Sequence, residues 1–467
     1  MQQKAQKARL TEGAIGLTLV KLTIPMIFGV LGMVIFNIID TFFVGQLGTH
    51  ELAALSFTFP VVLVVSSLAM GLGVGTSAMV SRAIGEGYHA RVQRLTTDSL
   101  VLSVLLSSVL VIIGLLTMDP VFRLLGATPE ILPLVKQYMV IWFPGAVFMI
   151  VPMVGNNAIR ATGDTKTPSY VMLVAVIINM VLDPLFIFGI GPFPRLEIAG
   201  AALTTLFARA ITFVVALWVL YRRERMITIT PPNLNEVLHS WKSILYIGLP
   251  TAGATMIIPL TIGVVTRLVS AYGPVAVAAF GAASRIDMFS LVIVMALSSA
   301  LGPFVGQNWG AGGKERVRKA VAYGQYFSLG WGLLVFLILA LAGKPIAALF
   351  NDNPNVVATM VLYFWIVPLG YGFQGVVYLS NGVLNVLHRP LYAAGLTIVQ
   401  TLLLQIPLAY VGGYLFGLNG IFGAAVVANT MVGTIALVWL RRIVTDMDTP
   451  TQKVAAPQVS RPQQEAI

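Results

Sequence analysis

Two aspartates stand inside apolar stretches of the chain, each preceded by an asparagine at helical spacing. Asp40 lies in GVLGMVIFNIIDTFFVGQLG and Asp183 in VAVIINMVLDPLFIFG. Asn37 comes three residues before Asp40, and Asn179 comes four before Asp183, so each amide shares a helix face with its carboxyl group. A carboxylate inside a membrane costs about 2.5–3.5 kcal/mol unless it is neutral, paired or reached by water. Residues of this kind can bind and release a proton or another cation.

The composition predicts that the rest of the chain spans a membrane. Hydrophobic residues make up 57% of the 467 residues and charged residues 10%, whereas about 25% are charged in soluble proteins. Apolar runs of about 20 residues cross the hydrocarbon, and such runs recur throughout the sequence. We therefore expect an all-α integral membrane protein with twelve transmembrane helices. Their expected ranges are 17–44, 52–80, 95–117, 132–158, 168–191, 199–221, 243–271, 275–305, 320–343, 356–386, 391–413 and 418–440.

The sequence repeats at an offset of 225 residues. Pro25 aligns with Pro250, and Gly48 aligns with Gly273. A shared offset maintained over more than about a hundred positions indicates an internal duplication. An even number of spans in each copy gives both copies the same orientation. We expect two six-helix lobes related by pseudo-two-fold symmetry about the membrane normal.

The duplication does not extend to the acids. Val265 stands at the position equivalent to Asp40, and the neighbourhood of Gln405 faces Asp183. Both acids fall about 7–9 Å below the outer surface, at a rise of about 1.5 Å per residue, so a shared polar pocket is plausible. Two equivalent lobes for movement, with charge in one of them, is the arrangement expected of a transporter.

Basic residues predict the orientation. Lys and Arg gather at the N-terminus and in every second loop, and basic loops stay in the cytoplasm. Both termini are therefore expected on the cytoplasmic side of the membrane. We expect this membrane to be a bacterial inner membrane. The formal net charge of +11 follows from this topology, so we expect no nucleic-acid partner. The expected segments are a cytoplasmic N-terminus (1–9), an N-lobe (10–223), a cytoplasmic connector (224–242), a C-lobe (243–442) and a disordered tail (443–467).

The sequence lacks the residues that several kinds of chemistry require. The chain has no cysteine and only four histidines, all in predicted loops and without metal-ligand spacing. No GxxxxGK[ST] phosphate loop is present. We therefore expect neither an enzyme, nor a cofactor, nor a metal site.

Charged residues in the second lobe lie closer to helix ends. Arg267 falls near the end of span seven, and Arg285 and Asp287 fall near the start of span eight. We interpret them as gate or lobe-contact residues, with solvated interfacial charge as the alternative. Arg209 is the basic residue found in the middle of a span, on span six.

Three segments resemble multidrug and toxic compound extrusion transporters. They are NxxDTFFVGQLG (Asn37 to Gly48), the RATGDTKTP loop (Arg160 to Pro168) and NxxxDP (Asn179 to Pro184). The resemblance covers about residues 10–442. An acid in span one with Asn and Asp in span five is similar to the DinF-type branch. The NorM-type branch places acids in the C-lobe, where spans seven and ten of this chain have none and only Asp287 remains.

The DinF-type resemblance implies that Asp40 is the principal protonation site and that Asp183 is its partner. It also implies a hydroxyl partner on span six, for which the sequence leaves two adjacent threonines open. Asn156 is counted near the cytoplasmic end of span four, although a bend at Pro144 or Pro152 would change that count. The expected network and substrate-binding residues are Asn179, Asn156, Asn37, Phe36, Thr204 and Thr205.

The expected mechanism is multidrug efflux by proton antiport, a function that confers antibiotic resistance. A lipophilic cation is attracted by ionised Asp40 and Asp183, and protonation from outside releases it outward. Gly29 and Gly32 would let span one bend, with Pro25 at its entrance; close helix packing is the alternative role for these glycines.

Three rival functions stay open. Na⁺ could replace H⁺ as the coupling ion, because carboxyl and amide oxygens can also ligate sodium. A lipid or polysaccharide-precursor flippase usually has a strongly cationic cavity, whereas Arg209 is alone here. A channel or a non-transporting receptor is disfavoured by duplicated lobes with a charged site in only one of them, because pores usually repeat their selectivity element. The expected partners are small-molecule drugs, organic cations and membrane lipids, and we expect a monomer.

Overall fold

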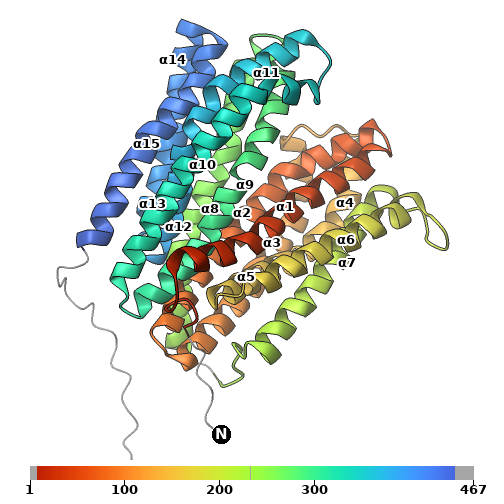
Figure 1. Cartoon of the computed structure of the whole chain (residues 1–467). Coiled ribbons are helices and arrows are strands. Elements are labelled where there is room, and N and C mark those ends of the chain that lie inside the picture. Colours follow the sequence, from red (N-terminus) through yellow and green to blue (C-terminus); the bar gives the residue numbers. More distant parts are fainter. Residues whose placement is uncertain (1–7, 232, 447–467) are drawn as a thin grey trace, which may run out of the picture.

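The structure, a computed structural model, describes residues 8–231 and 233–446, with all their side chains except those of Asn37 and Asp446. This part of the chain is helical throughout, without strands (Figure 1). Twelve helical segments are long and apolar enough to cross a membrane. The prediction of a twelve-span, all-α membrane protein is thereby confirmed.

The helices follow one another in two groups of six spans. The first group contains α1 (Ile15–Gly45), α2 (Thr49–Gly85), α3 (His89–Leu124), α4 (Leu132–Gly145), α5 (Val147–Ala161), α6 (Lys166–Phe188), α7 (Glu197–Trp218) and the π-helix η1 (Val219–Arg223). The second group contains α8 (Leu234–Ser270), α9 (Pro274–Gly310), α10 (Lys314–Ala348), α11 (Pro354–Ile366), the 3₁₀-helix η2 (Val367–Gly370), α12 (Tyr371–Val386), α13 (Pro390–Ile398), the π-helix η3 (Val399–Gln405), α14 (Ile406–Phe416) and α15 (Leu418–Asp446).

Both copies of the repeat interrupt their fourth span at an equivalent position. In the first lobe, α4 ends at Gly145 and α5 begins at Val147, directly after Pro144. In the second lobe, the 3₁₀ turn η2 ends at Gly370, 225 residues after Gly145. Proline lacks an N–H and weakens the helical ladder, which explains the break after Pro144. The duplication is therefore a property of the backbone as well as of the sequence.

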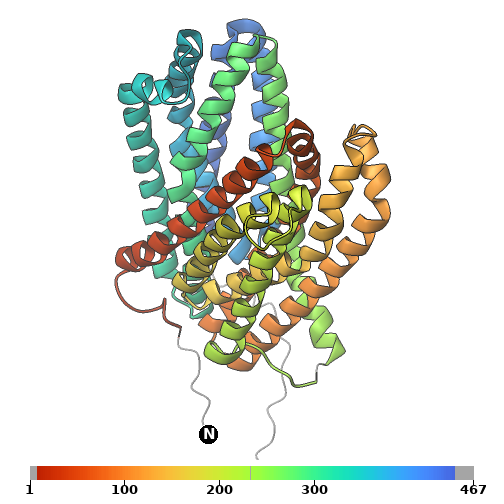
Figure 2. The same cartoon turned by 90° about the vertical axis from the view of Figure 1, so that its right-hand side faces the viewer.

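The two lobes approach each other at one end and diverge at the other. Figures 1 and 2 show them meeting at the end of the molecule near residues 8 and 446. We call this end the terminal side and the other the opposite side. One apolar core includes buried residues of both lobes, such as Val80 and Phe304, whereas a second core around Phe422 lies within the C-lobe alone.

Glycine makes the contact between the lobes very close. A Cβ atom on Gly85 would lie 2.1 Å from the carbonyl oxygen of Gln307, and one on Gly310 would lie 2.2 Å from that of Arg82. An offset of 225 converts Gly85 into Gly310 and Arg82 into Gln307. The pseudo-two-fold axis therefore passes between α2 and α9. Any larger residue at either glycine would push the lobes apart on the terminal side.

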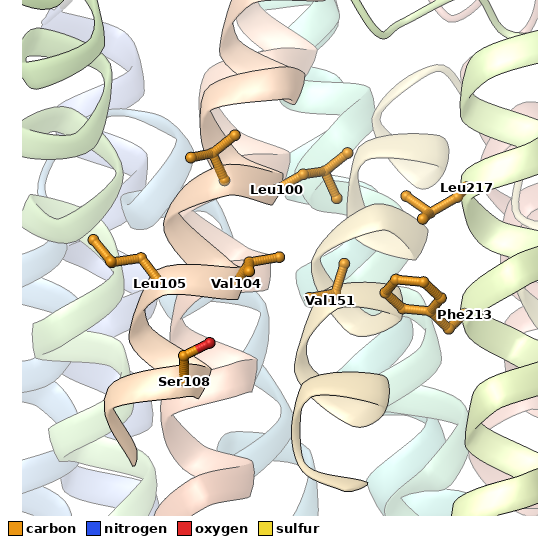
Figure 3. Close-up of a pocket in the computed structure, with 8 residues that line it drawn as sticks. Leu100, Val104, Leu105, Ser108, Val151, Phe213 and Leu217 are labelled. Atoms are coloured by element: carbon orange, nitrogen blue, oxygen red, sulfur yellow. The ribbon is translucent and has the colours of Figure 1, made fainter. Parts of the chain in front are cut away.

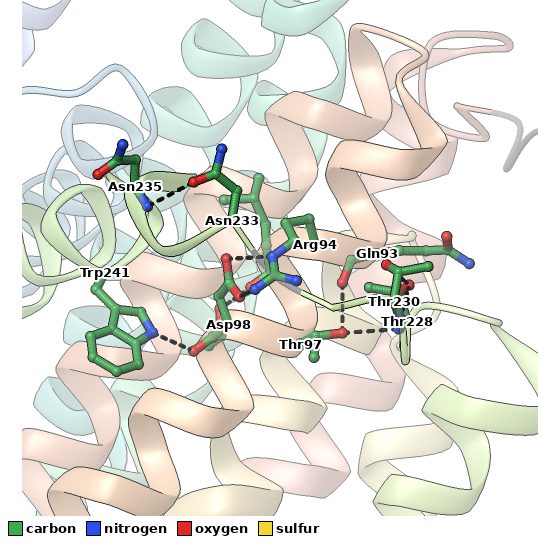
Figure 4. A network of polar contacts seen from close by, with 11 residues as sticks. Gln93, Arg94, Thr97, Asp98, Thr228, Thr230, Asn233, Asn235 and Trp241 are labelled. Atoms are coloured by element: carbon green, nitrogen blue, oxygen red, sulfur yellow. Dashed lines mark hydrogen bonds and ion pairs between the residues drawn. The ribbon is translucent and has the colours of Figure 1, made fainter. Parts of the chain in front are cut away.

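The connector between the lobes is attached to the start of α3 (Figure 4). The backbone N–H of Thr228 donates to the Thr97 hydroxyl at 3.0 Å. The indole of Trp241, in the first turns of α8, donates to the Asp98 carbonyl at 3.0 Å. Arg94 forms a 2.6 Å ion pair with the enclosed Asp98 carboxylate. These bonds fix α8, and with it the start of the C-lobe, to the terminal side of the N-lobe.

Candidate functional site

Asp183 is enclosed on α6 among neutral hydrogen-bond donors. The side-chain N–H of Asn179 donates to Asp183 Oδ1 at 3.0 Å. The Thr204 hydroxyl, on α7, donates to the same oxygen. All three side chains are fully buried, and Asp183 Oδ2 has no partner among the described residues. One carboxyl oxygen is thus held in place, while the other is left to carry or accept a proton.

Asp40 lies on α1 and differs from Asp183 in its surroundings. It is partly exposed, and its Oδ1 is enclosed without a hydrogen-bond partner among the described residues. Asp40 interacts electrostatically with Asp183 and Arg209. The predicted pairing of Asp40 with Asp183 therefore takes the form of charge interaction between α1 and α6, because no hydrogen bond joins the two described carboxyl groups.

Arg209 and Tyr138 complete this group of side chains, which we call the N-lobe cluster (Asp40, Tyr138, Asn179, Asp183, Thr204 and Arg209). Arg209 is half-buried on α7, and its guanidinium lies 5.5 Å from the ring centroid of Trp142 on α4. Tyr138, also on α4, is buried within electrostatic range of Asp40, Asp183 and Arg209.

Arg209 and Tyr138 were not among the predicted site residues. A lone base in the middle of a span was the available signal for Arg209, because such residues are usually functional. Tyr138 carried no comparable signal, since its span is rich in aromatic residues.

The other expected network residues are not joined to Asp183. The Thr205 hydroxyl and Asn156 Oδ1 are both enclosed without partners among the described residues. Phe36 is half-buried on α1, and the side chain of Asn37 lies outside the described residues. Of the two candidate threonines, the structure places Thr204 on the carboxylate.

The expected hinge lies within one unbroken helix. α1 contains Pro25, Gly29 and Gly32 and continues to Gly45. A Cβ atom on Gly29 would lie 3.1 Å from Ser169 Oγ on α6, whereas one on Gly32 would meet α6 side chains at 3.6 Å. Both glycines therefore lie in the contact between α1 and α6, the two helices that carry Asp40 and Asp183.

The C-lobe charges were expected to be gate or lobe-contact residues, and this role stays a prediction. Asp287, on α9, accepts hydrogen bonds from the Tyr363 and Tyr371 hydroxyls of α11 and α12, so its described partners lie inside the C-lobe. Arg267 and Arg285 are exposed, as the alternative of solvated interfacial charge requires.

A chain of amides lies deeper in the C-lobe, and the sequence analysis did not assign it. Gln400 Nε2 donates to Asn429 Oδ1 at 2.6 Å, and Asn429 Nδ2 lies 3.5 Å from Gln374 Oε1. Gln374 Nε2 in turn donates to the Tyr378 hydroxyl at 3.2 Å. Polar side chains joining helices in this way stabilise packing in a membrane.

A pocket of about 400 Å³ lies elsewhere in the N-lobe, between α3, α5 and α7 (Figure 3). Leu100 and Val104 line it from α3, Val151 from α5 and Phe213 from α7, and Ser108 is its polar residue. No acidic or basic side chain lines this pocket, so it is separate from the N-lobe cluster. Among the described residues, no group of three or more His, Asp or Glu side chains is arranged to hold a metal ion.

Comparison with known proteins agrees with the duplicated fold. The family model described as MatE matches this chain twice, over residues 25–185 and 250–411. The chain belongs to the MATE family of transporters. The two MATE matches begin 225 residues apart, which is the offset of the internal repeat. As a MATE transporter, the chain is not an enzyme.

Relatives and solved structures of MATE proteins cover nearly the whole chain. An "FAD transporter" of Shewanella oneidensis is 38% identical over 434 residues, which is 93% of this chain and 96% of that relative. "Multidrug export protein MepA" of Staphylococcus haemolyticus is 26% identical over 91% of this chain and 93% of its own length. The crystal structure of the Vibrio cholerae MATE transporter VcmN in the bent form matches with a TM-score of 0.89 at 29% identity, covering 94% of this chain and 99% of VcmN.

Proposed function

We propose that this MATE chain is a proton-coupled exporter of the bacterial inner membrane and that Asp40 and Asp183 carry the coupling protons. One observation carries the proposal. Two carboxyl groups lie inside α1 and α6, two membrane-spanning helices that pack against each other, and each group has an enclosed oxygen without a described partner. Like charges held together in a membrane favour protonation of at least one group. The same residues support an assignment to the DinF-type branch.

The donors around Asp183 favour a proton over sodium. A sodium site needs several oxygen atoms directed at one point. Asn179 and Thr204 instead direct their N–H and O–H groups at Asp183 Oδ1, so their donor hydrogens stand where ligand oxygens would be needed. Asp183 Oδ2 is left for the proton.

Charge in the N-lobe cluster can control substrate release. Ionised Asp40 and Asp183 with cationic Arg209 give the cluster a net charge of −1. Protonation of one acid makes it neutral, and protonation of both makes it positive. A lipophilic cation is therefore attracted before protonation and released after it, which is the order that antiport requires.

The closed terminal side gives this exchange a direction. We place the termini in the cytoplasm because the basic loops lie on their side. Contacts such as Gly85 with Gln307 then close the cytoplasmic side, while the lobes diverge towards the exterior (Figure 1). This conformation is the one in which protons would enter and substrate would leave. Rocking of the lobes about the axis between α2 and α9 would produce the inward-facing state.

A second candidate substrate is a flavin dinucleotide. It is favoured by the 38% identity to the Shewanella oneidensis "FAD transporter", compared with 26% to a multidrug export protein. Such a substrate combines planar aromatic rings with negative charge. Outward movement of an anion is also assisted by the membrane potential, by about 2.3 kcal/mol per charge per 100 mV.

Transport by the purified protein in liposomes tests the proposal. The vesicles would carry an imposed proton gradient without sodium, and uptake of ethidium and of FAD would be measured separately. We expect the gradient to drive at least one substrate with the wild type and neither with Asp183→Asn. Asp119→Asn is the control, because Asp119 lies at the end of α3 in an exposed pair with Lys136. Equal transport by Asp183→Asn and wild type contradicts the proposal.

A further inference from the structure

Arg209 is a membrane-embedded cation without a fixed anionic partner. It lies on α7, within the span Glu197–Arg223. Its guanidinium forms no hydrogen bond or ion pair with another described side chain, and the π face of Trp142 lies 5.5 Å away. Tyr138 and Asp40 lie within electrostatic range. An arginine inside a span is costly, which is why such residues normally serve a function.

The contact with Trp142 leaves the hydrogen-bonding edge of Arg209 available. Guanidinium N–H groups lie in the plane of the group, whereas an aromatic ring covers its face. Asp40 is close enough to interact electrostatically but is not within ion-pair distance. A planar fork of donors matches the oxygen atoms of a phosphate group.

We infer that Arg209 binds the phosphate group of an aromatic substrate such as a flavin nucleotide, while the buried ring of Trp142 supports the guanidinium. Phosphate accepts two parallel hydrogen bonds from one guanidinium, and such charge-assisted pairs are stronger than neutral ones. This inference rests on the proposed function, because it takes the N-lobe cluster as a place that substrate reaches. It extends that function by assigning a residue to the anionic part of the substrate.

The charge of Asp40 should affect phosphate binding at Arg209 in a direction that can be tested. Ionised Asp40 repels a phosphate and partly satisfies Arg209 by long-range attraction. Neutral Asp40 leaves Arg209 as the uncompensated charge on that side of the cluster. Asp40→Asn therefore strengthens binding of a phosphate-bearing ligand, whereas it weakens binding of a cationic drug such as ethidium. The proton antiport proposed above thus applies to cationic substrates, and a phosphate-bearing substrate would leave with the assistance of the membrane potential instead.

Equilibrium binding of three flavins to the full chain in lipid nanodiscs tests the inference. Riboflavin has no phosphate, FMN has one and FAD has two, while all share the same ring system. Fluorescence of the flavin ring would give each dissociation constant for wild type, Arg209→Gln and Arg209→Lys. Arg123→Gln is the matched control, because Arg123 is an exposed arginine in the last turn of α3.

We expect Arg209→Gln to weaken FMN and FAD binding at least about tenfold and to leave riboflavin binding unchanged. Arg209→Lys should fall between, because it keeps the charge but loses the planar fork, and Asp40→Asn should bind FMN more tightly than wild type. Equal losses for all three flavins, no loss for any, or absence of FMN binding to wild type would overturn the inference. If Arg209→Gln does not fold, the FMN dissociation constants of Arg209→Lys and Asp40→Asn still test the inference.

The result is separable from proton coupling. Binding is measured at equilibrium without a gradient, so a failure of proton-driven transport leaves the flavin comparison intact. Conversely, proton-coupled transport of ethidium with no effect of Arg209→Gln on FMN binding would overturn the phosphate site alone.

Discussion

Asn179 donates its side-chain N–H to Asp183 at 3.0 Å, one helical turn along α6. Both side chains are fully buried, whereas Asp40 on the facing helix α1 is partly exposed. The two acids therefore have different access to protons although they interact with each other. In the mechanism we propose, Asp40 is the first proton acceptor, and Asp183 is the acid whose environment is fixed by hydrogen bonds.

The two adjacent threonines of α7 provide a matched pair of variants. Thr204→Val removes a hydroxyl that donates to Asp183, while Thr205→Val removes an enclosed hydroxyl without a described partner. Because a hydrogen bond to a charged group contributes about 1.5–3 kcal/mol, we expect Thr204→Val to reduce proton-driven transport about tenfold or more. Thr205→Val should keep nearly wild-type rates in the same liposome assay. The reverse order would contradict the assigned partner of Asp183.

This pair also shows why the sequence could not complete the site. Successive helical residues differ in direction by about 100°, so only the rotation of α7 against α6 decides which threonine meets Asp183. The same reason hid Tyr138, whose approach to Asp40 depends on how α4 packs. Asp40, Asp183 and Asn179 were recognisable because a buried acid and an amide at i, i−4 stand out within one helix.

The architecture was predictable to a greater extent. Hydrophobic length alone indicated twelve spans, and the alignment of Gly48 with Gly273 indicated the repeat. The position of Asp287 was not predictable, because its tyrosine partners come from α11 and α12, more than 70 positions further along the chain. The spacing of residues along the sequence predicts which side chains share a face of one helix. It does not predict which side chains of two different helices come into contact.

Packing between α1 and α6 predicts different effects for two glycines. An added methyl group at Gly29 would lie 3.1 Å from Ser169 Oγ, whereas the nearest atoms at Gly32 are 3.6 Å away. We expect Gly29→Ala to slow transport several-fold more than Gly32→Ala, with normal expression of both. Adding Ser169→Ala should restore the Gly29→Ala rate by removing the crowded oxygen. Failure of this rescue would favour a hinge role over packing, and wild-type rates for both glycine variants would exclude either role.

The hydrogen bonds of Gln307 predict that this residue holds the two lobes together on the terminal side; we call this contact the latch. This fully buried C-lobe residue donates to the Ala161 carbonyl at 2.7 Å and accepts from the Leu10 N–H at 3.1 Å, so it holds two N-lobe backbone segments. Gln307→Met removes these bonds and leaves the backbone groups unsatisfied. We expect the closed terminal side to open more often. Gln325→Met is the control, because Gln325 bonds to Arg441 within the C-lobe.

Spin labels can measure this opening directly. The chain has no native cysteine, so cysteines at Ala90 and Ala311, both exposed on the terminal side, would carry the only labels. A longer-distance population should grow in Gln307→Met and not in Gln325→Met. Identical distance distributions for wild type and Gln307→Met would contradict the latch.

The surroundings of His388 predict that closure of the terminal side depends on pH. Burial, followed by the positive charges of Arg82 and Arg91 in the N-lobe, lowers the pKa of His388 below its usual value of 6.5. Tyr246 on α8 is its aromatic neighbour, and Glu86 pairs with both arginines. Opening removes these surroundings and restores proton affinity. The closed form therefore loses stability as pH falls through about 6.5.

The same spin-label pair would test this sign. Measured in an Asp40→Asn, Asp183→Asn background, the open population should rise between pH 8 and pH 5.5. His388→Gln should make the distribution independent of pH over this range. A pH response that survives His388→Gln would assign the effect to other groups.

Proton release from everted membrane vesicles tests the central claim most directly. The vesicles would be energised to an acidic interior in sodium-free buffer, and a pH-sensitive dye would record the response to added ethidium or FAD. The account predicts that wild type releases protons with at least one substrate and that Asp40→Asn releases none. Release by Asp40→Asn equal to wild type, or release by wild type only after sodium is added, would contradict proton coupling through the N-lobe acids.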